Sequence, residues 1–420
     1  MPQANDNIQI ALIGAGGMGS GDARMATAIP GVKLVAVCDI YNGRLERAKE
    51  RWGNALFTTR DYREVLGRDD VDAVIIATPD HWHKQLSMDA LAARKHVYCE
   101  KPMVHSIDEG KDVIEVQQAS GKTFQVGSQY VSSLVYQKAR DLLKSGAIGE
   151  INLVEAWLDR NTAIGAWQYS IPPDASPSNI DWDRFLGSAP KRPFEPIRLF
   201  RWRNYVDYGT GVAGDLFVHL LSGLHLATGS LGPTRVYATG GQYFWKDGRD
   251  VPDLMLALLD YPKTEQHPAF TVSLKVNFES ALPEESFGVK FVGSEGTMTT
   301  GYSELTLSRH PRETEPGYTI ETFAKATQEQ FLREYHAKYP QTRPNAGSMR
   351  PNREEKFVPP PGSDAHVLHH QNFYAAVRAG RPSIEDAVFG LRAAGPALLT
   401  NVSYFERRTC GWDPRTMQRT

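Results

Sequence analysis

An acid and a histidine stand four residues apart in the stretch GTGVAGDLFVHLLSGLHLATG, residues 209–229. This spacing predicts that Asp215 and His219 lie on one face of a helix. Histidine is the side chain whose ordinary pKa suits a general base near neutral pH, and oxidation of an alcohol needs a base for the hydroxyl proton. We therefore predict that His219 is this base and that Asp215 orients it or binds a substrate hydroxyl. The alternative is a histidine packed in an apolar core.

The stretch IALIGAGGMGSG near the amino terminus ends an apolar run in glycines. Gly14, Gly16 and Gly19 match G-x-G-x-x-G after a predicted strand, and Asp39 ends the next strand. In a dinucleotide-binding fold the glycines admit the pyrophosphate and let a helix pack closely, and the acid binds the ribose hydroxyls. A purely structural turn is the alternative. The carboxylate of Asp39 favours NAD over NADP, although Arg44 nearby could hold a 2′-phosphate.

The elements that must position these residues begin with four short apolar runs. IQIALI, KLVAVC, DAVIIAT and HVYC are rich in β-branched residues, which is typical of strands covered on both faces. Helix-like segments such as GRLERAKERWG separate them. This alternation predicts βαβ units and a parallel sheet.

The pattern changes from residue 151 onward, where longer strand-like runs predict an antiparallel sheet. We expect an α/β protein with a Rossmann dinucleotide-binding domain at 1–125. A C-terminal α+β domain with an open, mostly antiparallel sheet follows at 126–420, its last helices packing back on the first domain. Two long segments lack a predicted element. We interpret 159–210 as a substrate lid or wall and 310–365 as an interface arm or mobile loop, with a plain surface loop as the alternative for each.

Composition and charge favour small-molecule partners. With 41% hydrophobic and 23% charged residues the chain is of the globular class, and its net charge of -2 gives no basic surface for nucleic acid or an anionic membrane. No apolar run approaches the ~20 residues of a transmembrane helix, and the amino terminus has no signal-peptide pattern. Three widely spaced cysteines fit neither a disulfide framework nor a zinc site. We expect a cytoplasmic protein that binds no metal.

Five further pieces of the sequence are similar to the Gfo/Idh/MocA oxidoreductase family. They follow the glycines in the order ATPDHWH (77–83), CEKP (99–102), VGSQ (126–129), GDLFVH (214–219) and GSEGT (293–297). The resemblance extends from residue 8 to about residue 300. It implies a Rossmann domain followed by an open-faced sheet, an active site between the two, and homodimers or homotetramers formed through the sheet.

The resemblance also implies roles for residues in these motifs. Lys101 is expected to reach the reacting centre and to polarise the substrate oxygen, because the carboxyl ends of parallel strands face the ligand crevice. Pro102 is expected to be cis. His81 and His83 lack further metal ligands, so cofactor contact or helix capping is expected instead. The expected cofactor contacts are Gly14, Gly16, Gly17, Met18, Gly19, Asp39, Thr78, His81, His83, Glu100, Lys101 and Gln129.

The aromatic segment RLFRWRNYVDYG supplies candidates for sugar recognition. Aromatic faces stack on sugar rings, and arginine donates hydrogen bonds to hydroxyls or carboxylates. The candidates are Arg160, Arg201, Trp202 and Tyr208. Ordinary packing is the alternative for each of them, and Arg203 and Tyr205 stand in the same segment. Ser222 departs from the family, which often has a second aspartate there, so the pattern of substrate hydroxyls stays open.

The resemblance implies an NAD-dependent oxidoreductase that transfers a hydride between a secondary alcohol of a sugar, cyclitol or sugar derivative and the nicotinamide. The alternative is a glycosidase that keeps its NAD and works by transient oxidation, elimination, water addition and re-reduction. That chemistry needs a further base, for which Tyr208 or another residue of the segment 159–210 is a candidate. A non-catalytic NAD-dependent sensor is a third interpretation, which Lys101, Asp215 and His219 disfavour.

Overall fold

The computed structural model describes residues 7–282, 285–310, 316–340 and 354–420. Its first sheet has six parallel strands in the order β3-β2-β1-β4-β5-β6, which is the Rossmann order. These strands are β1 (Ile8–Ile13), β2 (Val32–Cys38), β3 (Phe57–Thr59), β4 (Ala73–Ile76), β5 (His96–Cys99) and β6 (Phe124–Val126). The predicted parallel sheet and α/β class are confirmed.

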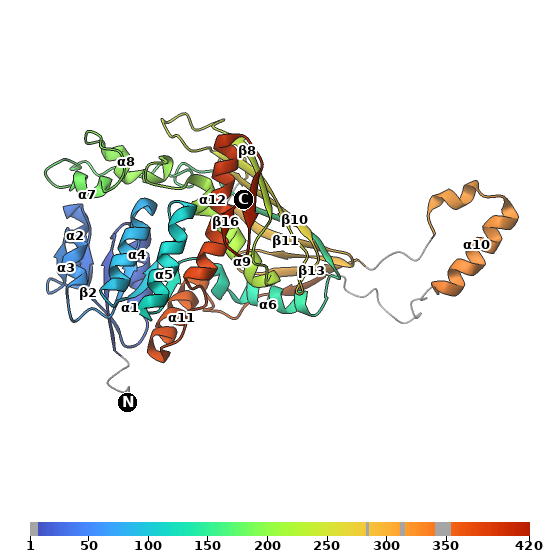
Figure 1. Cartoon of the computed structure of the whole chain (residues 1–420), viewed down its shortest axis with the longest axis horizontal. Helices are drawn as coiled ribbons and strands as arrows, with labels where there is room; N and C mark the ends of the chain where they lie inside the picture. The colour runs from blue at the N-terminus through green and yellow to red at the C-terminus, as the bar shows by residue number, and fades with distance from the viewer. Residues whose placement is uncertain (1–6, 283–284, 311–315, 341–353) are drawn as a thin grey trace.

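Helices cover both faces of this sheet, which explains why every residue of its inner strand β4 is apolar and buried (Figure 1). They are α1 (Gly17–Thr27), α2 (Asn42–Trp52), α3 (Tyr62–Leu66), α4 (His83–Ala92) and α5 (Gly110–Ser120). Alternate residues of β1 face opposite ways: Ile10 and Leu12 are buried in the same cluster as Ala23 of α1, while Ala11 belongs to the cluster of Leu86 in α4.

The second sheet has ten strands in the order β14-β13-β12-β11-β7-β10-β9-β8-β15-β16. They are β7 (Ile151–Asp159), β8 (Arg235–Gly241), β9 (Leu254–Tyr261), β10 (Phe270–Asn277), β11 (Ser286–Gly293), β12 (Gly296–Thr300), β13 (Leu305–Arg309), β14 (Glu354–Phe357), β15 (Cys410–Asp413) and β16 (Gln418–Arg419). Within this sheet β7 and β10 pair in parallel, and the other paired strands are antiparallel. The expected open, mostly antiparallel sheet is confirmed.

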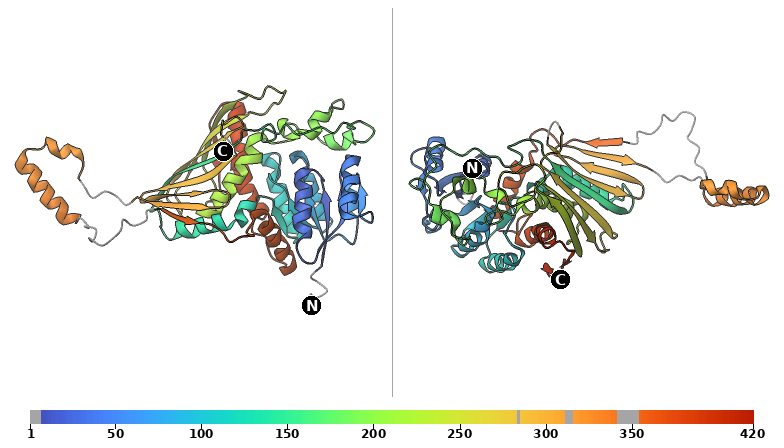
Figure 2. Two further views of the ribbon diagram at one scale, coloured as in Figure 1. Left: turned by 180° about the vertical axis from the view of Figure 1, so that it is seen from behind. Right: turned by 90° about the horizontal axis from the view of Figure 1, so that it is seen from above.

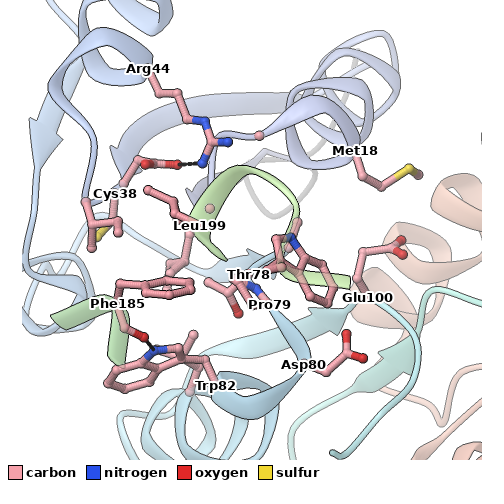
Figure 3. A pocket seen from close by; sticks show the side chains of 18 of the residues that line it. Met18, Cys38, Arg44, Thr78, Pro79, Asp80, Trp82, Glu100, Phe185 and Leu199 are labelled. Carbon is pink, nitrogen blue, oxygen red and sulfur yellow. Dashed lines mark hydrogen bonds and ion pairs between the residues drawn. The ribbon is translucent and has the colours of Figure 1, made fainter. Parts of the chain in front are cut away.

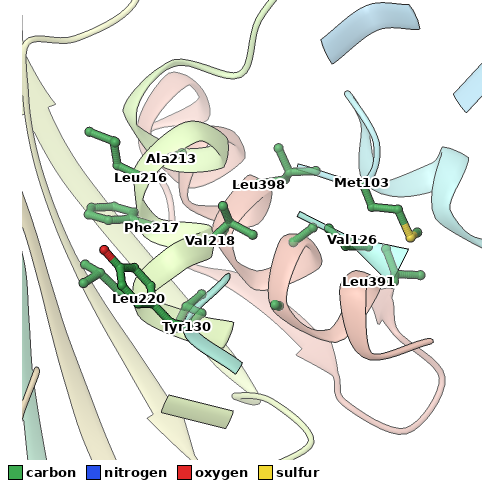
Figure 4. Packing of buried hydrophobic residues seen from close by; sticks show 14 of the residues in the cluster. Met103, Val126, Tyr130, Ala213, Leu216, Phe217, Val218, Leu220, Leu391 and Leu398 are labelled. Atoms are coloured by element: carbon green, nitrogen blue, oxygen red, sulfur yellow. The ribbon is translucent and has the colours of Figure 1, made fainter. Parts of the chain in front are cut away.

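One apolar core joins the two sheets. Helices α6 (Leu134–Lys144), α9 (Val218–Thr228) and α12 (Ala387–Glu406) lie on the inner side of the second sheet, and α12 also packs against α5 and β6. Leu391 and Leu398 of α12 belong to the same buried cluster as Val126 of β6 and Val218 of α9 (Figure 4). Helix α11 (Ala365–Ala379) packs on α1. The site between the domains therefore rests on a continuous core.

Two segments leave the body of the protein. Residues 160–210, which we call the strap, carry α7 (Trp182–Leu186) and α8 (Pro196–Phe200) and pass above the carboxyl ends of the first sheet (Figure 1). Helix α10 (Lys325–Lys338) buries none of its residues and lies apart from the body in both further views (Figure 2). The sequence pattern indicated neither α7, α8 nor α10, and part of 310–365 lies outside the described residues.

Candidate active site between the two domains

The glycines of the turn after β1 are of two kinds. Gly14 and Gly19 are packed against other backbone atoms, whereas Gly16 and Gly17 face open space. Gly14 has φ +94°, and a Cβ there would lie 2.6 Å from the carbonyl oxygen of Ala77. A Cβ on Gly19 would lie 2.1 Å from the carbonyl oxygen of Gly14, so α1 packs directly on the turn. At Gly17 a Cβ meets nothing within 4 Å, and at Gly16 only the guanidinium of Arg44, no closer than 3.7 Å. The backbone at these two positions is left accessible to a ligand.

Asp39 closes one side of this turn. Its carboxylate accepts hydrogen bonds from the backbone N–H of Ala15 at 2.8 Å and of Tyr41 at 3.0 Å. The Nη1 atom of Arg44 lies 3.4 Å from the same carboxylate, an ion pair drawn in Figure 3. A buried negative charge is thus held where the second strand of the sheet ends.

A cavity of about 610 Å³ extends from this turn along the carboxyl ends of the strands (Figure 3). Its floor belongs to the first domain and its roof to the strap, which contributes Phe185 and Leu199. Ten of the residues predicted from the sequence line it: Gly14, Gly16, Gly17, Met18, Asp39, Thr78, His83, Glu100, Lys101 and Trp202.

Three of the predicted cofactor residues do not line the cavity. Gly19 packs the helix, as described above. Gln129 is buried in the turn before α6. His81 faces the strap, with Nε2 2.8 Å from the carbonyl oxygen of Phe185 and Nδ1 3.3 Å from that of Tyr208.

His83 joins two of the motifs beneath the cavity. Its Nδ1 lies 2.7 Å from the carbonyl oxygen of Pro102, and its Nε2 lies 2.9 Å from that of Thr78. Carbonyl oxygens only accept hydrogen bonds, so a ring nitrogen must carry a proton to bond either of them. Burial by itself lowers the pKa of His83, but Cys99 and the carboxylate of Asp80 outweigh it and raise the pKa to about 10. His83 therefore fixes the loops that carry Thr78 and Lys101.

A buried ion-pair cluster lies at the end of the cavity away from Asp39. Lys101 follows β5, and its peptide to Pro102 is cis, as expected. Its Nζ donates to the carboxylate of Asp215 at 2.7 Å and to the main-chain oxygen of the same residue at 2.9 Å. The Nε of Arg203, on the strap, donates to the same carboxylate oxygen at 3.1 Å. Burial alone raises the pKa of Asp215, but Lys101 and Arg203 together hold it well below its usual value.

His219 stands one helical turn beyond Asp215 without contacting its carboxylate, and neither residue is among those that line the cavity. Asp215 lies in a π-helical segment (Ala213–Phe217) that opens the helix, and π-bulges are frequent at functional sites. His219 packs edge-on against the ring of Tyr130, with centroids 5.5 Å apart, and its Nδ1 is buried with no partner among the described residues. Burial and the charge of Lys101 hold the pKa of His219 well below its usual value. The imidazole is therefore neutral and able to accept a proton.

Three residues that line the cavity have a polar atom without a partner among the described residues. These atoms are Oε1 of Glu100, Oγ1 of Thr78 and Oδ1 of Asp80. Burial, followed by the nearby carboxylate of Asp22, raises the pKa of Glu100 to about 8. Buried polar atoms are rarely left unpaired, and a polar ligand above the strand ends would satisfy those of Glu100 and Thr78. Together with the open backbone at Gly16 and Gly17, this environment fits a dinucleotide.

The strap brings some of the predicted substrate residues to the site and holds others away. Trp202 lines the cavity, and so do Arg203 and Tyr169, which the sequence signalled only through the aromatic and arginine content of the segment. The remaining three face elsewhere. Arg160 pairs with Glu285, Arg201 donates to the main-chain oxygen of Tyr169, and Tyr208 is fully buried against Phe185 and His81.

In the described part of the chain, no group of three or more histidine, cysteine, aspartate or glutamate side chains could hold a metal ion. Over the same residues no helix is long and apolar enough to cross a membrane.

Two family models match the chain. One, described as the oxidoreductase family with an NAD-binding Rossmann fold, matches residues 8–128. The other, described as the C-terminal alpha/beta domain of the oxidoreductase family, matches residues 157–238. Each match falls on the corresponding domain of the structure.

Two kinds of protein are among the similar sequences. Inositol 2-dehydrogenase of Salmonella typhimurium is 32% identical over 145 residues, which is 34% of this chain and 43% of that protein. Glycosyl hydrolase family 109 protein 2 of Shewanella sp. is 30% identical over 182 residues, 39% of this chain and 40% of that protein. The chain therefore spans less than half the length of these curated relatives.

Among solved structures, levoglucosan dehydrogenase in complex with NADH and levoglucosan superposes with a TM-score of 0.66. The alignment covers 96% of this chain and 98% of that one, at 18% identity. At this identity the similarity establishes a common fold.

Proposed function

The chain belongs to the Gfo/Idh/MocA oxidoreductase family, and on that premise we propose that it is an NAD-dependent oxidoreductase. It transfers a hydride between a secondary alcohol of a sugar, cyclitol or sugar derivative and the nicotinamide. When bound, NAD supplies the acceptor or donor of that hydride. The observation that carries the proposal is the Lys101, Asp215 and Arg203 cluster at one end of a cavity whose other end is the glycine turn.

Lys101 polarises the reacting oxygen. An ammonium group has three N–H donors, and Asp215 takes two of them through its carboxylate and its main-chain oxygen. The third donor stays available for the substrate alcohol or ketone. Asp215 thus positions Lys101. The spacing of four residues between Asp215 and His219 predicts instead that Asp215 orients His219 or binds a substrate hydroxyl.

His219 accepts the hydroxyl proton. Its ring is neutral because burial and Lys101 disfavour the imidazolium, and a neutral ring nitrogen has a lone pair for the proton. Trp202 and Arg203 on the strap contact the substrate, since both face the cavity. Tyr208 is not proposed as a further base because its side chain is fully buried and burial raises the pKa of its phenol.

NAD is the proposed cofactor rather than NADP. The buried carboxylate of Asp39 repels a 2′-phosphate and accepts ribose hydroxyls, and Arg44 is already paired with it. The residues proposed to hold the dinucleotide are Gly14, Gly16, Gly17, Met18, Asp39, Thr78, Glu100 and Lys101.

A glycosidase that uses transient oxidation is the second candidate. A glycosyl hydrolase of family 109 is similar to this chain at nearly the same identity as the inositol 2-dehydrogenase. This similarity supports the glycosidase as a second candidate. The first steps of both reactions need the same polarising ammonium and the same base. They differ in whether the electrons leave the enzyme.

A panel of free sugars, cyclitols and aryl glycosides separates the two. Absorbance is followed both at the nicotinamide wavelength and at the aglycone wavelength. Net NADH formation from a free sugar supports the dehydrogenase, and aglycone release without net NADH supports the glycosidase. Absence of both across the panel would contradict the proposal.

We also propose a cytoplasmic location and a homodimer or homotetramer. Cys38, Cys99 and Cys410 are buried and free, as expected in a reducing compartment. The outer face of the second sheet exposes Tyr237, Leu256 and Leu258, and exposed apolar patches are typical of subunit contacts. Sedimentation of the purified protein tests the oligomer.

A further inference from the structure

Two cations share one carboxylate at the end of the cavity away from Asp39. The Nζ of Lys101 and the Nε of Arg203 both donate to Oδ1 of Asp215, at 2.7 and 3.1 Å. The side chains of Lys101 and Arg203 are 10% and 21% exposed, so both cations are largely shielded from water. Asp215 neutralises only one of them. The remaining positive charge is costly to bury unless a partner of opposite charge is present.

Neighbouring carboxyl groups do not supply that partner. Glu100 and Asp80 line the same cavity. Burial raises the pKa of both, and that of Glu100 reaches about 8, so its carboxyl group is mostly protonated at neutral pH. The phosphates of a dinucleotide would be held at the glycine turn, which is the other end of the cavity. A substrate with a negative charge would supply the missing partner.

Arg203 keeps donors available for such a substrate. A guanidinium group has five N–H donors in a planar fork, and Asp215 accepts from the one on Nε. Within the part of the chain that the structure describes, the two Nη atoms form no hydrogen bond or ion pair, and Arg203 lines the cavity. Two parallel N–H groups on this side of the guanidinium match the two oxygens of a carboxylate.

The position of this guanidinium is fixed by its own segment. Its Cζ lies 4.2 Å from the ring centroid of Trp202, on which the group stacks. The backbone N–H of Asp250 donates to the carbonyl of Asn204 at 3.0 Å, which fixes the turn Trp202–Asn204. A Cβ on Gly209 would lie 3.1 Å from the Cα of Arg203, so the strap folds closely over this turn. A group ordered in advance loses less entropy when it binds a ligand.

The strap that carries Arg203 is anchored to the domain that carries Lys101. The hydroxyl of Tyr41 in the first domain donates to the carboxylate of Asp174 on the strap at 2.6 Å. The separation of the two cations is therefore set by the fold. Because both contact the same oxygen atom, the Nζ of Lys101 and the Nε of Arg203 are no farther apart than the width of a sugar ring. One sugar unit can reach both cations.

We propose that the substrate is a sugar acid, free or as a glycoside, whose carboxylate binds the Nη atoms of Arg203 while Lys101 binds the reacting oxygen. The carboxylate and the reacting hydroxyl belong to the same sugar unit, because one unit reaches both cations. The carboxylate anchors the sugar and takes no part in the hydride transfer. This proposal rests on the proposed function for the reaction and names its class of substrate.

The test compares pairs of substrates that differ only in a carboxylate in place of a CH2OH group. The pairs are D-glucuronate and D-glucose, D-galacturonate and D-galactose, D-gluconate and D-sorbitol, and the aryl glycosides of the first two pairs. We measure kcat/KM for the full chain with NAD, by nicotinamide and by aglycone absorbance. Calorimetric titration of the protein loaded with NADH gives the Kd of each compound without turnover.

The variant Arg203→Lys keeps the positive charge and removes the fork. The matched control is Arg192→Lys, which makes the same change elsewhere on the strap. Arg192 pairs with Asp207 at 2.6 Å and is not among the residues that line the cavity. Thermal unfolding of both variants shows whether they are folded.

We expect the acid of at least one pair to exceed its neutral partner about tenfold or more in kcat/KM and in affinity, the effect of one hydrogen bond between charged groups. Arg203→Lys should lower kcat/KM for this acid about tenfold more than for the neutral partner. Arg192→Lys should leave the ratio within about twofold, because partly exposed pairs contribute little.

The outcomes separate this proposal from the proposed function. Turnover confined to neutral sugars or cyclitols, or equal kcat/KM within every pair, would overturn the sugar-acid proposal and leave the proposed function intact. An equal loss for acid and neutral partner in a folded Arg203→Lys protein would show that Arg203 only positions Asp215, which also overturns it. If Arg203→Lys does not fold, the ratios of the unmodified protein decide. Turnover of no compound in the panel, acid or neutral, contradicts the proposed function itself.

Discussion

Replacing Asp215 by asparagine tests the ion-pair cluster with little change of shape. The side chains of Asp215 and Lys101 are 6% and 10% exposed. Breaking a buried ion pair by removing one charge costs about 3–5 kcal/mol, and we expect about 3 kcal/mol because the amide oxygen still accepts a hydrogen bond. Each kcal/mol lost from the free energy of unfolding lowers the melting temperature of a large domain by about 2 °C, so the melting temperature should fall by about 6 °C.

The same change should impair catalysis more than cofactor binding. Lys101 loses a charge-assisted hydrogen bond worth about 1.5–3 kcal/mol, which corresponds to roughly a 10- to 150-fold lower kcat/KM if it positions the ammonium in the transition state. Asp215 does not line the cavity, so the Kd for NAD should change less than twofold.

The assays are thermal unfolding, NAD binding by fluorescence, and kcat/KM with the best substrate of the panel. Asp112→Asn is the matched control, because it makes the same chemical change in a 2.6 Å ion pair with Lys84 whose side chains are 50% and 31% exposed. Such exposed pairs contribute at most about 1 kcal/mol. An Asp215→Asn protein that unfolds like the control and keeps kcat/KM within twofold of the unmodified protein would refute the reasoning.

The pH dependence of stability has a defined sign for this group. The pKa of Asp215 is lowered on folding, so its contribution is present above the unfolded value of 3.8 and is lost as the pH falls below it. The free energies of unfolding of Asp215→Asn and of the unmodified protein should therefore become more similar as the pH is lowered from 5 to 3.

Further predictions concern the glycine turn, the ammonium and the base. Gly16→Val should abolish NAD binding with a nearly unchanged melting temperature, because the new side chain enters the space left for the ligand, whereas Gly19→Val should lower the melting temperature because its Cβ meets the oxygen of Gly14. Differential scanning fluorimetry and NAD titration separate the two, and equal effects would contradict this division. Lys101→Ala should reduce kcat at least a hundredfold, a magnitude typical of losing an electrostatic stabiliser of the transition state, while NAD still binds; retained turnover would remove it from the mechanism. The acid limb of kcat/KM should lie below pH 6.5, because the pKa of His219 is lowered. For the same reason His219 makes the folded protein less stable below pH 6.5, where only the unfolded imidazole takes up a proton. His219→Gln should remove only its own share of that dependence, because the pKa values of other buried histidines such as His225 and His369 are lowered too.

Local patterns in the sequence determined the first domain and part of its site. The spacing of Gly14, Gly16 and Gly19 after an apolar run predicts a strand, turn and helix, because each step depends on neighbouring residues and their backbone freedom. Lys101 and Thr78 could be placed at the crevice because parallel strands end on the same edge of a sheet.

Tertiary structure decided which groups face each other across the domains. A spacing of four residues places Asp215 and His219 on one side of a helix, but the partners of Asp215 are Lys101, more than a hundred residues earlier, and Arg203 on the strap. The strap has no hydrophobic period that reveals its path, because its fold depends on attachments such as Tyr41 to Asp174. Long-range contacts of this kind depend on how the whole chain packs, and no local pattern encodes them.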